Sequence, residues 1–97
     1  MTIHETPYNL DWIIELVKQQ EPERHDILNG LLNCKNGVWR NNAYLQFVDS
    51  KNANQPGAEW QIDDSIVFEH KTEGDIVIDL LKGGRIGGIE FISRIEQ

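Results

Sequence analysis

The sequence has little cysteine, no long apolar run and fewer bases than acids. Its single cysteine, Cys34, cannot form an internal disulfide or a cysteine-based zinc site alone, which agrees with a reducing compartment. No apolar run approaches the roughly 20 residues that cross a bilayer. Residues 1–5 lack the basic start and apolar stretch of a signal peptide. We therefore expect a cytoplasmic protein with no membrane association.

Positive charge is the scarcest property of the chain. Sixteen acids against nine bases give a formal net charge of -7. A surface of that sign repels phosphate backbones, so nucleic acid is not an expected partner. Between positions 59 and 79 there is one base, Lys71, among seven acids: Glu59, Asp63, Asp64, Glu69, Glu73, Asp75 and Asp79. This run is either a solvated face that maintains solubility or a docking surface for a basic partner.

The length and composition predict one small globular domain over residues 1–97. A hydrophobic content of 39% together with eight glycines lies in the ordinary range for folded proteins. A chain of 97 residues supports one core and leaves little room for a large internal cavity. We expect its function to be carried by the surface.

The first half of the chain is predicted to be helical. Apolar residues with helical spacing follow Asn9, a suitable N-cap, and the pattern ends near Gln20, before Pro22. Residues 23–34 permit two interpretations. Their leucines and Ile27 have helical spacing, although Gly30 weakens a helix by about 1 kcal/mol relative to alanine. We favour a short second helix; the alternative is a strand that runs to a turn at Asn36-Gly37.

From Val38 onward the apolar residues alternate with a period of two, which indicates strands. Residues 43–48 and 60–68 fit strands, with a bulge or tight bend at Asp63-Asp64 and a loop over residues 49–58 between them. Residues 75–81 and 85–92 form the clearest hairpin around a turn at 82–84. The fold class is therefore α+β, with an N-terminal helix, or two, packed on a twisted antiparallel sheet of four to six strands.

The large aromatic residues and the glycines of the last strand suggest close packing. Trp39, Trp60 and Tyr44 either fill the core or anchor an interface, and for Trp60 we favour the core. Gly87 and Gly88 weaken a strand unless the backbone forms a bulge there or another group packs directly over it. We expect the sheet to curve at these glycines.

No catalytic residues emerge from the motifs, and we expect no enzyme and no cofactor. The three histidines, His4, His25 and His70, lack the spacing that places two on one helix face, and carboxylates near Cys34 would raise its thiol pKa. Asp75 and Asp79 on one strand lie about 13 Å apart, beyond the ~5 to 9.5 Å used by acid–base pairs at a sugar.

Metal and phosphate sites are also not predicted. A Ca²⁺ or Mg²⁺ site at Asp63 and Asp64, completed by neighbouring strands, stays an alternative, although no EF-hand loop is present. The glycine-rich run 83–88 opens onto a strand pattern and not onto a helix, so it does not resemble a phosphate-binding loop.

Recognition of another protein is the function that the residues favour. Carboxylates spaced along a rigid sheet can occupy the positions of phosphates on a basic protein and speed its encounter. Val77 lies between Asp75 and Asp79, and Leu81 follows Asp79 with the same alternation, so this strand face presents charged and apolar side chains together. We predict that the partner-binding residues are Glu59, Asp63, Asp64, Glu69, Asp75 and Asp79.

Two segments resemble a known family. Residues 74–91, which close in Gly88-Ile89-Glu90-Phe91, and the earlier Gly57-Ala58-Glu59-Trp60 are similar to small acidic immunity proteins of bacterial contact-dependent growth inhibition systems. The resemblance covers the C-terminal 40 residues or so. It implies a cytoplasmic protein that binds a cognate toxin domain, often a basic nuclease such as a ribonuclease, and blocks its active site. It supplies no catalytic residue.

Two other functions remain open at this stage. One is a self-associating structural or regulatory subunit that buries an apolar sheet face against its own copy. The other is a small metal-dependent hydrolase that uses the carboxylate strip at Asp63 and Asp64. The sequence leaves the identity of the toxin, the face that binds it and the choice between monomer and dimer undetermined.

Overall fold

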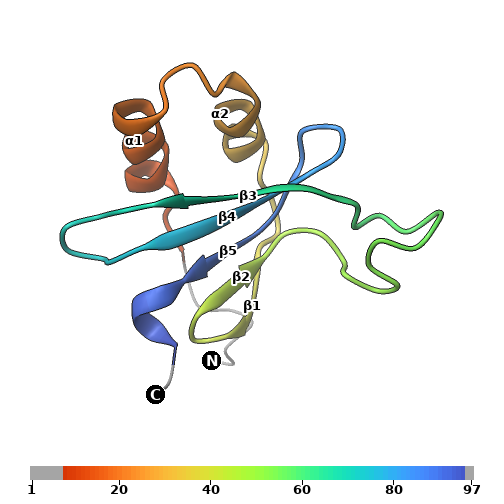
Figure 1. Ribbon diagram of the computed structural model, residues 1–97. Coiled ribbons are helices and arrows are strands. Elements are labelled where there is room, and N and C mark those ends of the chain that lie inside the picture. The colour runs from red at the N-terminus through yellow and green to blue at the C-terminus, as the bar shows by residue number, and fades with distance from the viewer. Residues whose placement is uncertain (1–7, 96–97) are drawn as a thin grey trace.

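The computed structural model describes residues 8–95 (Figure 1). The expectations about His4 and about a leader at residues 1–5 lie outside this range. Two helices and a five-stranded sheet follow one another along the chain, which confirms the predicted α+β class. Within residues 8–95 no helix is long and apolar enough to cross a membrane.

Both helices of the first half form as the apolar spacing predicts. Helix α1 spans Asp11–Gln20 and helix α2 spans His25–Leu32, so the strand alternative for residues 23–34 is wrong. Asn9 accepts a hydrogen bond of 2.9 Å from the Asp11 amide, but Leu10 occupies the N-cap position itself. The helices are joined by the short turn that contains Pro22.

Gly30 explains why α2 tolerates a poor helix former. A Cβ atom at Gly30 would lie 2.7 Å from the Gly84 carbonyl oxygen and 2.9 Å from the Ile86 side chain. The helix therefore approaches the last hairpin closely enough that only glycine fits. Tertiary packing outweighs the helix propensity that made this segment ambiguous.

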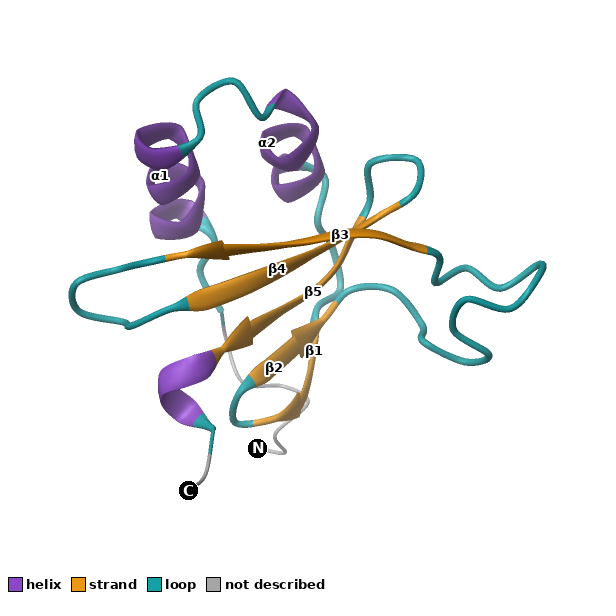
Figure 2. Ribbon diagram, in the orientation of Figure 1, coloured by secondary structure: helices purple, strands orange, loops and turns teal. Residues whose placement is uncertain are grey.

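The sheet is antiparallel throughout, in the spatial order β1-β2-β5-β4-β3 (Figure 2). A 3₁₀ turn over Ile92–Arg94 follows the last strand. The strands are β1 Val38–Asn41, β2 Tyr44–Gln46, β3 Ile62–Phe68, β4 Ile76–Leu81 and β5 Ile86–Phe91. The hairpin of β4 and β5 is confirmed, and so is the irregularity at Asp63-Asp64, where the pairing shifts between Ile62 and Asp64.

The hydrophobic core lies between the helices and one face of the sheet. Figure 2 shows α1 and α2 on the same side of the strands. The fully buried side chains from the helices are Ile13, Val17, Ile27 and Leu31, and they meet Leu45, Phe68, Ile76, Ile78 and Ile89 from the sheet. Burying each such side chain contributes about 1.5–3 kcal/mol relative to exposure, so this face holds the fold together.

The opposite face of the sheet is not covered by the helices. Successive strand residues point to opposite sides, so the residues between the core positions face outward. Two cross-strand rows result: Tyr44, Glu90, Val77 and Val67 in one, and Gln46, Gly88, Asp79 and Ser65 in the other. We call these eight residues the open face.

Candidate partner-binding face

A hydrogen-bonded chain crosses the open face. The Tyr44 hydroxyl donates to Asp79 Oδ2 at 2.7 Å, and the Ser65 hydroxyl donates to Asp79 Oδ1 at 2.8 Å. Residues from β2, β4 and β3 are thereby joined across the sheet. Both oxygens of Asp79 accept a hydrogen bond, so this half-buried carboxylate is fixed in one orientation.

Gly88 allows this chain to form. The side chain of Tyr44 lies across β5 directly over Gly88, where an added Cβ atom would collide with the Tyr44 hydroxyl oxygen and Cζ and would lie 2.7 Å from Cε2. Without a side chain at position 88, the ring reaches from β2 to the carboxylate on β4. The prediction that a group packs over Gly88 is confirmed.

Tyr44 is held as a neutral donor. Burial raises the pKa of its phenol far above the ordinary value, and the hydrogen bond to Asp79 and the charges of Asp79 and Glu90 raise it further. The phenol therefore keeps its proton at physiological pH. A neutral hydroxyl beside Asp79 leaves the negative charge of that carboxylate in place.

Gly87 allows Trp60 and Leu81 to pack closely against β5. The β5 backbone bulges at Gly87, since the register shifts between Asp79 and Leu80. An added Cβ atom at Gly87 would lie 2.7 Å from Trp60 Cζ3 and 3.0 Å from Leu81 Cδ2. Trp60 is half-buried and lies outside the main core cluster, so the expectation that it fills that core is wrong. Its ring packs directly against the backbone at Gly87, where a side chain would not fit.

Two of the six predicted binding acids, Asp75 and Asp79, lie on this side of the sheet. Asp79 belongs to the open face, and the exposed Asp75 immediately precedes β4 with the same alternation. Glu90 joins them from β5, as the cross-strand neighbour of Tyr44 and Val77. Sequence analysis did not select Glu90 for binding, because its distance from positions 59–79 along the chain conceals this pairing.

The other four acids lie elsewhere. Glu59 forms an ion pair of 3.5 Å with Arg85. Asp64 points to the helix side, with an oxygen 4.0 Å from Arg24 Nη2. The exposed Asp63 is the bulged residue of β3. The backbone of Glu69 is bound by the Gln20 side chain at the end of α1, with a hydrogen bond of 2.6 Å to its carbonyl oxygen. The run of acids between positions 59 and 79 is therefore not one surface.

Glu90 differs from its neighbours in having no partner in the described chain. Its carboxylate is half-buried, and within residues 8–95 it makes no hydrogen bond or ion pair. Arg85 pairs with Glu59 and not with Glu90. Arg40 belongs to the edge strand β1, where it lines a hollow with Gln46 and Asp49.

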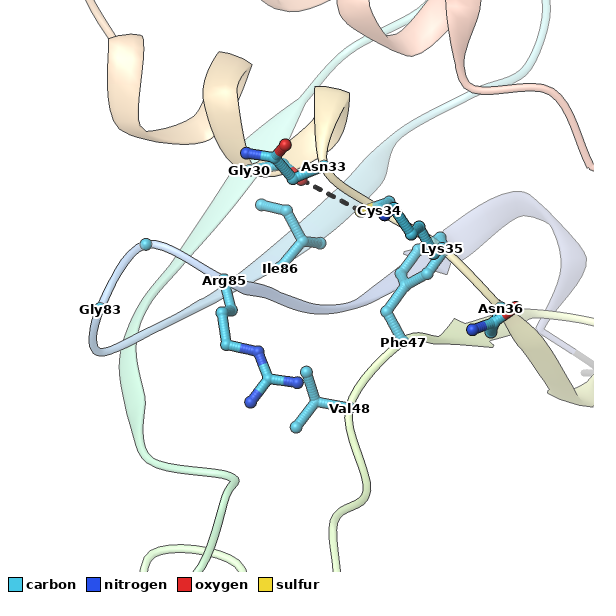
Figure 3. A pocket seen from close by; sticks show the side chains of 11 residues that line it. Gly30, Asn33, Cys34, Lys35, Asn36, Phe47, Val48, Gly83, Arg85 and Ile86 are labelled. Atoms are coloured by element: carbon cyan, nitrogen blue, oxygen red, sulfur yellow. Dashed lines mark hydrogen bonds between the residues drawn. The ribbon is translucent and has the colours of Figure 1, made fainter.

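A hollow of about 380 Å³ lies between the end of α2 and the turn after β4 (Figure 3). Cys34 lines it and donates a hydrogen bond of 3.3 Å to the Gly30 carbonyl. Burial raises the pKa of the Cys34 thiol to about 12. The thiol is therefore protonated at neutral pH, as expected, although the cause is burial and not nearby carboxylates. None of the eleven lining residues is a histidine or a carboxylate that would act as its base.

His70 has a structural role. Its Nδ1 accepts hydrogen bonds from the amides of Thr72 at 3.1 Å and Glu73 at 2.9 Å, which shapes the turn between β3 and β4. Its ring and that of Trp12 form an edge-to-face pair with a centroid distance of 5.0 Å. Among residues 8–95 no three side chains of histidine, cysteine, aspartate or glutamate gather closely enough to hold a metal ion.

Comparison of the chain with protein-family models, with curated proteins and with solved structures gives no match. The chemistry of the open face is therefore the basis for assigning a function. That face combines two carboxylates, one large aromatic ring and two valines, and the exposed Asp75 lies directly before it on the chain. These groups suit contact with a protein surface of opposite charge.

Proposed function

We propose that this protein is an inhibitor that binds a basic protein domain on the open face of its sheet. Following the family resemblance of its C-terminal segments, we take that domain to be a toxin, with nuclease activity as the leading candidate, whose cleft is blocked in the complex. The observation that supports this proposal is the placement of Asp75, Asp79 and Glu90 around Tyr44 and Val77 on one uncovered sheet face.

The composition of the open face fits an interface with a charged partner. Val67 has 59% of its surface exposed and pairs with Val77 near the end of the edge strand β3. Aromatic and aliphatic groups at the centre supply contact area, while carboxylates around them select partners of positive charge. The net charge of -7 adds a long-range attraction that speeds encounter with such a partner.

The test uses a basic toxin domain, chosen from the reading frame beside the gene, and measures its association with this protein. We expect the association rate to fall at least about tenfold between 20 and 500 mM salt, because screening weakens the attraction. A double charge reversal at Asp75 and Glu90 should weaken binding by about tenfold or more. Asp79 is a poor choice for reversal, because its loss would also strand the hydroxyls of Tyr44 and Ser65.

The matched control is a double charge reversal that changes the net charge equally on the helix side. Glu15 and Glu23 are exposed and lie on or beside the helices. Reversal of both should slow association only modestly and leave the dissociation rate unchanged. Equal losses of affinity in the two double variants would show that total charge, and not the open face, governs binding, and would contradict the proposal.

Self-association through the same face is the second candidate, and the exposure of Val67 favours it. In a symmetric pair the carboxylates of two open faces would oppose one another, so we expect such a dimer to form more readily at high salt. Sedimentation at 50 and 500 mM salt separates the two functions. A stable dimer with no affinity for the basic domain would replace the inhibitor proposal.

A further inference from the structure

Within the proposed function, on which this inference rests, we propose that the ring of Tyr44, bracketed by Glu90 and Asp79, is the receptor for an arginine side chain of the partner. The Tyr44 ring would then be one anchoring contact at the centre of the open face. Interfaces commonly derive most of their binding energy from a few such contacts.

The Tyr44 ring is held in one position on the sheet. Tyr44 lies over Gly88, and its hydroxyl is bonded to Asp79 at 2.7 Å. One side of the ring is thus packed on the sheet, and the ring is held at both ends. The helices lie on the other side of the sheet, and within residues 8–95 no aromatic side chain stacks on Tyr44. The ring is a fixed platform that can receive a second planar group.

Negative charge lies at both ends of the ring. Glu90 is the direct cross-strand neighbour of Tyr44, at the base of its ring, and Asp79 lies at the hydroxyl tip. The negative charges of Asp79 and Glu90 both act on the Tyr44 phenol, since each raises the pKa of that group. A cation above the ring is therefore attracted by the π-face and by two carboxylates together. Glu90 has both oxygens free of described partners, and Asp79 has lone pairs beyond the two it uses.

The shape of the site favours arginine over lysine. A guanidinium is flat, stacks on an aromatic ring and directs several donors outward in its plane, whereas an ammonium is compact and more strongly hydrated. Val77, the other cross-strand neighbour of Glu90, offers an apolar wall for the methylene stem of the arginine. These features match a stacked guanidinium that also pairs with Glu90.

The protein already contains the same combination elsewhere. The guanidinium carbon of Arg94 lies 4.5 Å from the centre of the Phe91 ring and 5.6 Å from that of Trp39. Arg94 Nη2 is also 3.4 Å from a carboxylate oxygen of Glu73. An arginine held between aromatic faces and a carboxylate is thus an arrangement that these residue types adopt in this fold. The Tyr44 site offers the same groups with the arginine position open to a partner.

The experiment uses acetyl-arginine amide as the probe, with acetyl-lysine amide as its comparison, in a ¹H–¹⁵N NMR titration. We expect saturable shifts at Tyr44, Gly88 and Glu90 with arginine, at millimolar affinity, and weaker binding of lysine. Glu90→Gln and Tyr44→Leu should each weaken arginine binding by about fivefold or more. Tyr44→Phe keeps the ring and should bind within about twofold, and the control Glu23→Gln should not change binding.

The outcomes separate this inference from the proposed function. Shifts that do not saturate, an affinity for the lysine probe equal to that for arginine, or an unchanged arginine affinity in Glu90→Gln would overturn the arginine site. The same variants, checked for an unchanged thermal midpoint, are then tested against the basic domain. If that domain binds them as well as the parent protein, the inhibitor proposal stands and the Tyr44 site is rejected. If the arginine probe binds at Tyr44 and the basic domain does not bind at all, the inhibitor proposal fails.

Discussion

Tyr44 and Asp79, 35 residues apart in the chain, are joined by a hydrogen bond of 2.7 Å that passes over Gly88. The contact links β2 to β4 across the intervening strand β5. It therefore depends on the correct register of three strands at once. The bond both stabilises the sheet and fixes the groups that we propose for binding.

Gly88→Ala should destabilise the protein by about 1–3 kcal/mol, because the new Cβ would collide with the Tyr44 ring. The measurement is a denaturant unfolding curve at neutral pH. In a Tyr44→Ala background the ring is absent, and the same substitution should cost less than about 0.5 kcal/mol, since alanine suits a strand at least as well as glycine. Additive effects of the two substitutions would show that the ring does not lie over Gly88.

The phenol of Tyr44 should remain protonated in alkaline solution at pH values where a free tyrosine, with a pKa of about 10, has ionised. Because its folded pKa is raised, the unfolded state loses this proton first, and stability should fall as the pH rises above about 10. Absorbance at 295 nm follows the ionisation, and comparison with Tyr44→Phe isolates the contribution of this residue. Asp79→Asn should lower the pKa of Tyr44, because it removes a negative charge and a charged acceptor. A Tyr44 phenol that titrates near pH 10 in the folded protein would contradict the geometry.

Local sequence patterns predicted the helices and the last hairpin, because each depends on residues close together in the chain. The helical spacing that ends near Gln20 and the bulge at Asp63-Asp64 are examples. The binding face depends instead on pairing between distant strands. Two acids of the run between positions 59 and 79 lie on opposite sides of the sheet, Asp64 on the helix side and Asp79 on the open side. Glu90, which is outside that run, lies on the same side as Asp79 but on a different strand. Alternation gives the side of a strand, but bulges and register decide which side chains meet.

Gly30→Ala decides between helix propensity and packing. Helix propensity alone predicts that alanine raises the free energy of unfolding by about 1 kcal/mol. However, its Cβ atom would lie 2.7 Å from the Gly84 carbonyl oxygen, a backbone atom that cannot move aside freely. We expect packing to win, with a net loss of about 1–2 kcal/mol. Asn29→Ala, at the exposed preceding position of the same helix, should be neutral or slightly stabilising. If Gly30→Ala is also stabilising, α2 does not approach the hairpin as closely as described.

Cys34 should resist alkylation in the folded protein. Its thiol is half-buried and donates a hydrogen bond to the Gly30 carbonyl, and burial raises its pKa to about 12, so the reactive thiolate is scarce at pH 8. Iodoacetamide labelling followed by mass spectrometry should be at least about a hundredfold slower in buffer than in 6 M urea, where the thiol regains its ordinary pKa of about 8.5.

The same raised pKa predicts that stability falls as the pH rises above about 8.5, because the unfolded state then loses the thiol proton before the folded state does. Cys34→Ala should remove that part of the pH dependence. Labelling at equal rates in buffer and in urea would show that the Cys34 thiol is open to solvent. The hollow that Cys34 lines, between α2 and the last hairpin, would then be a candidate reactive site.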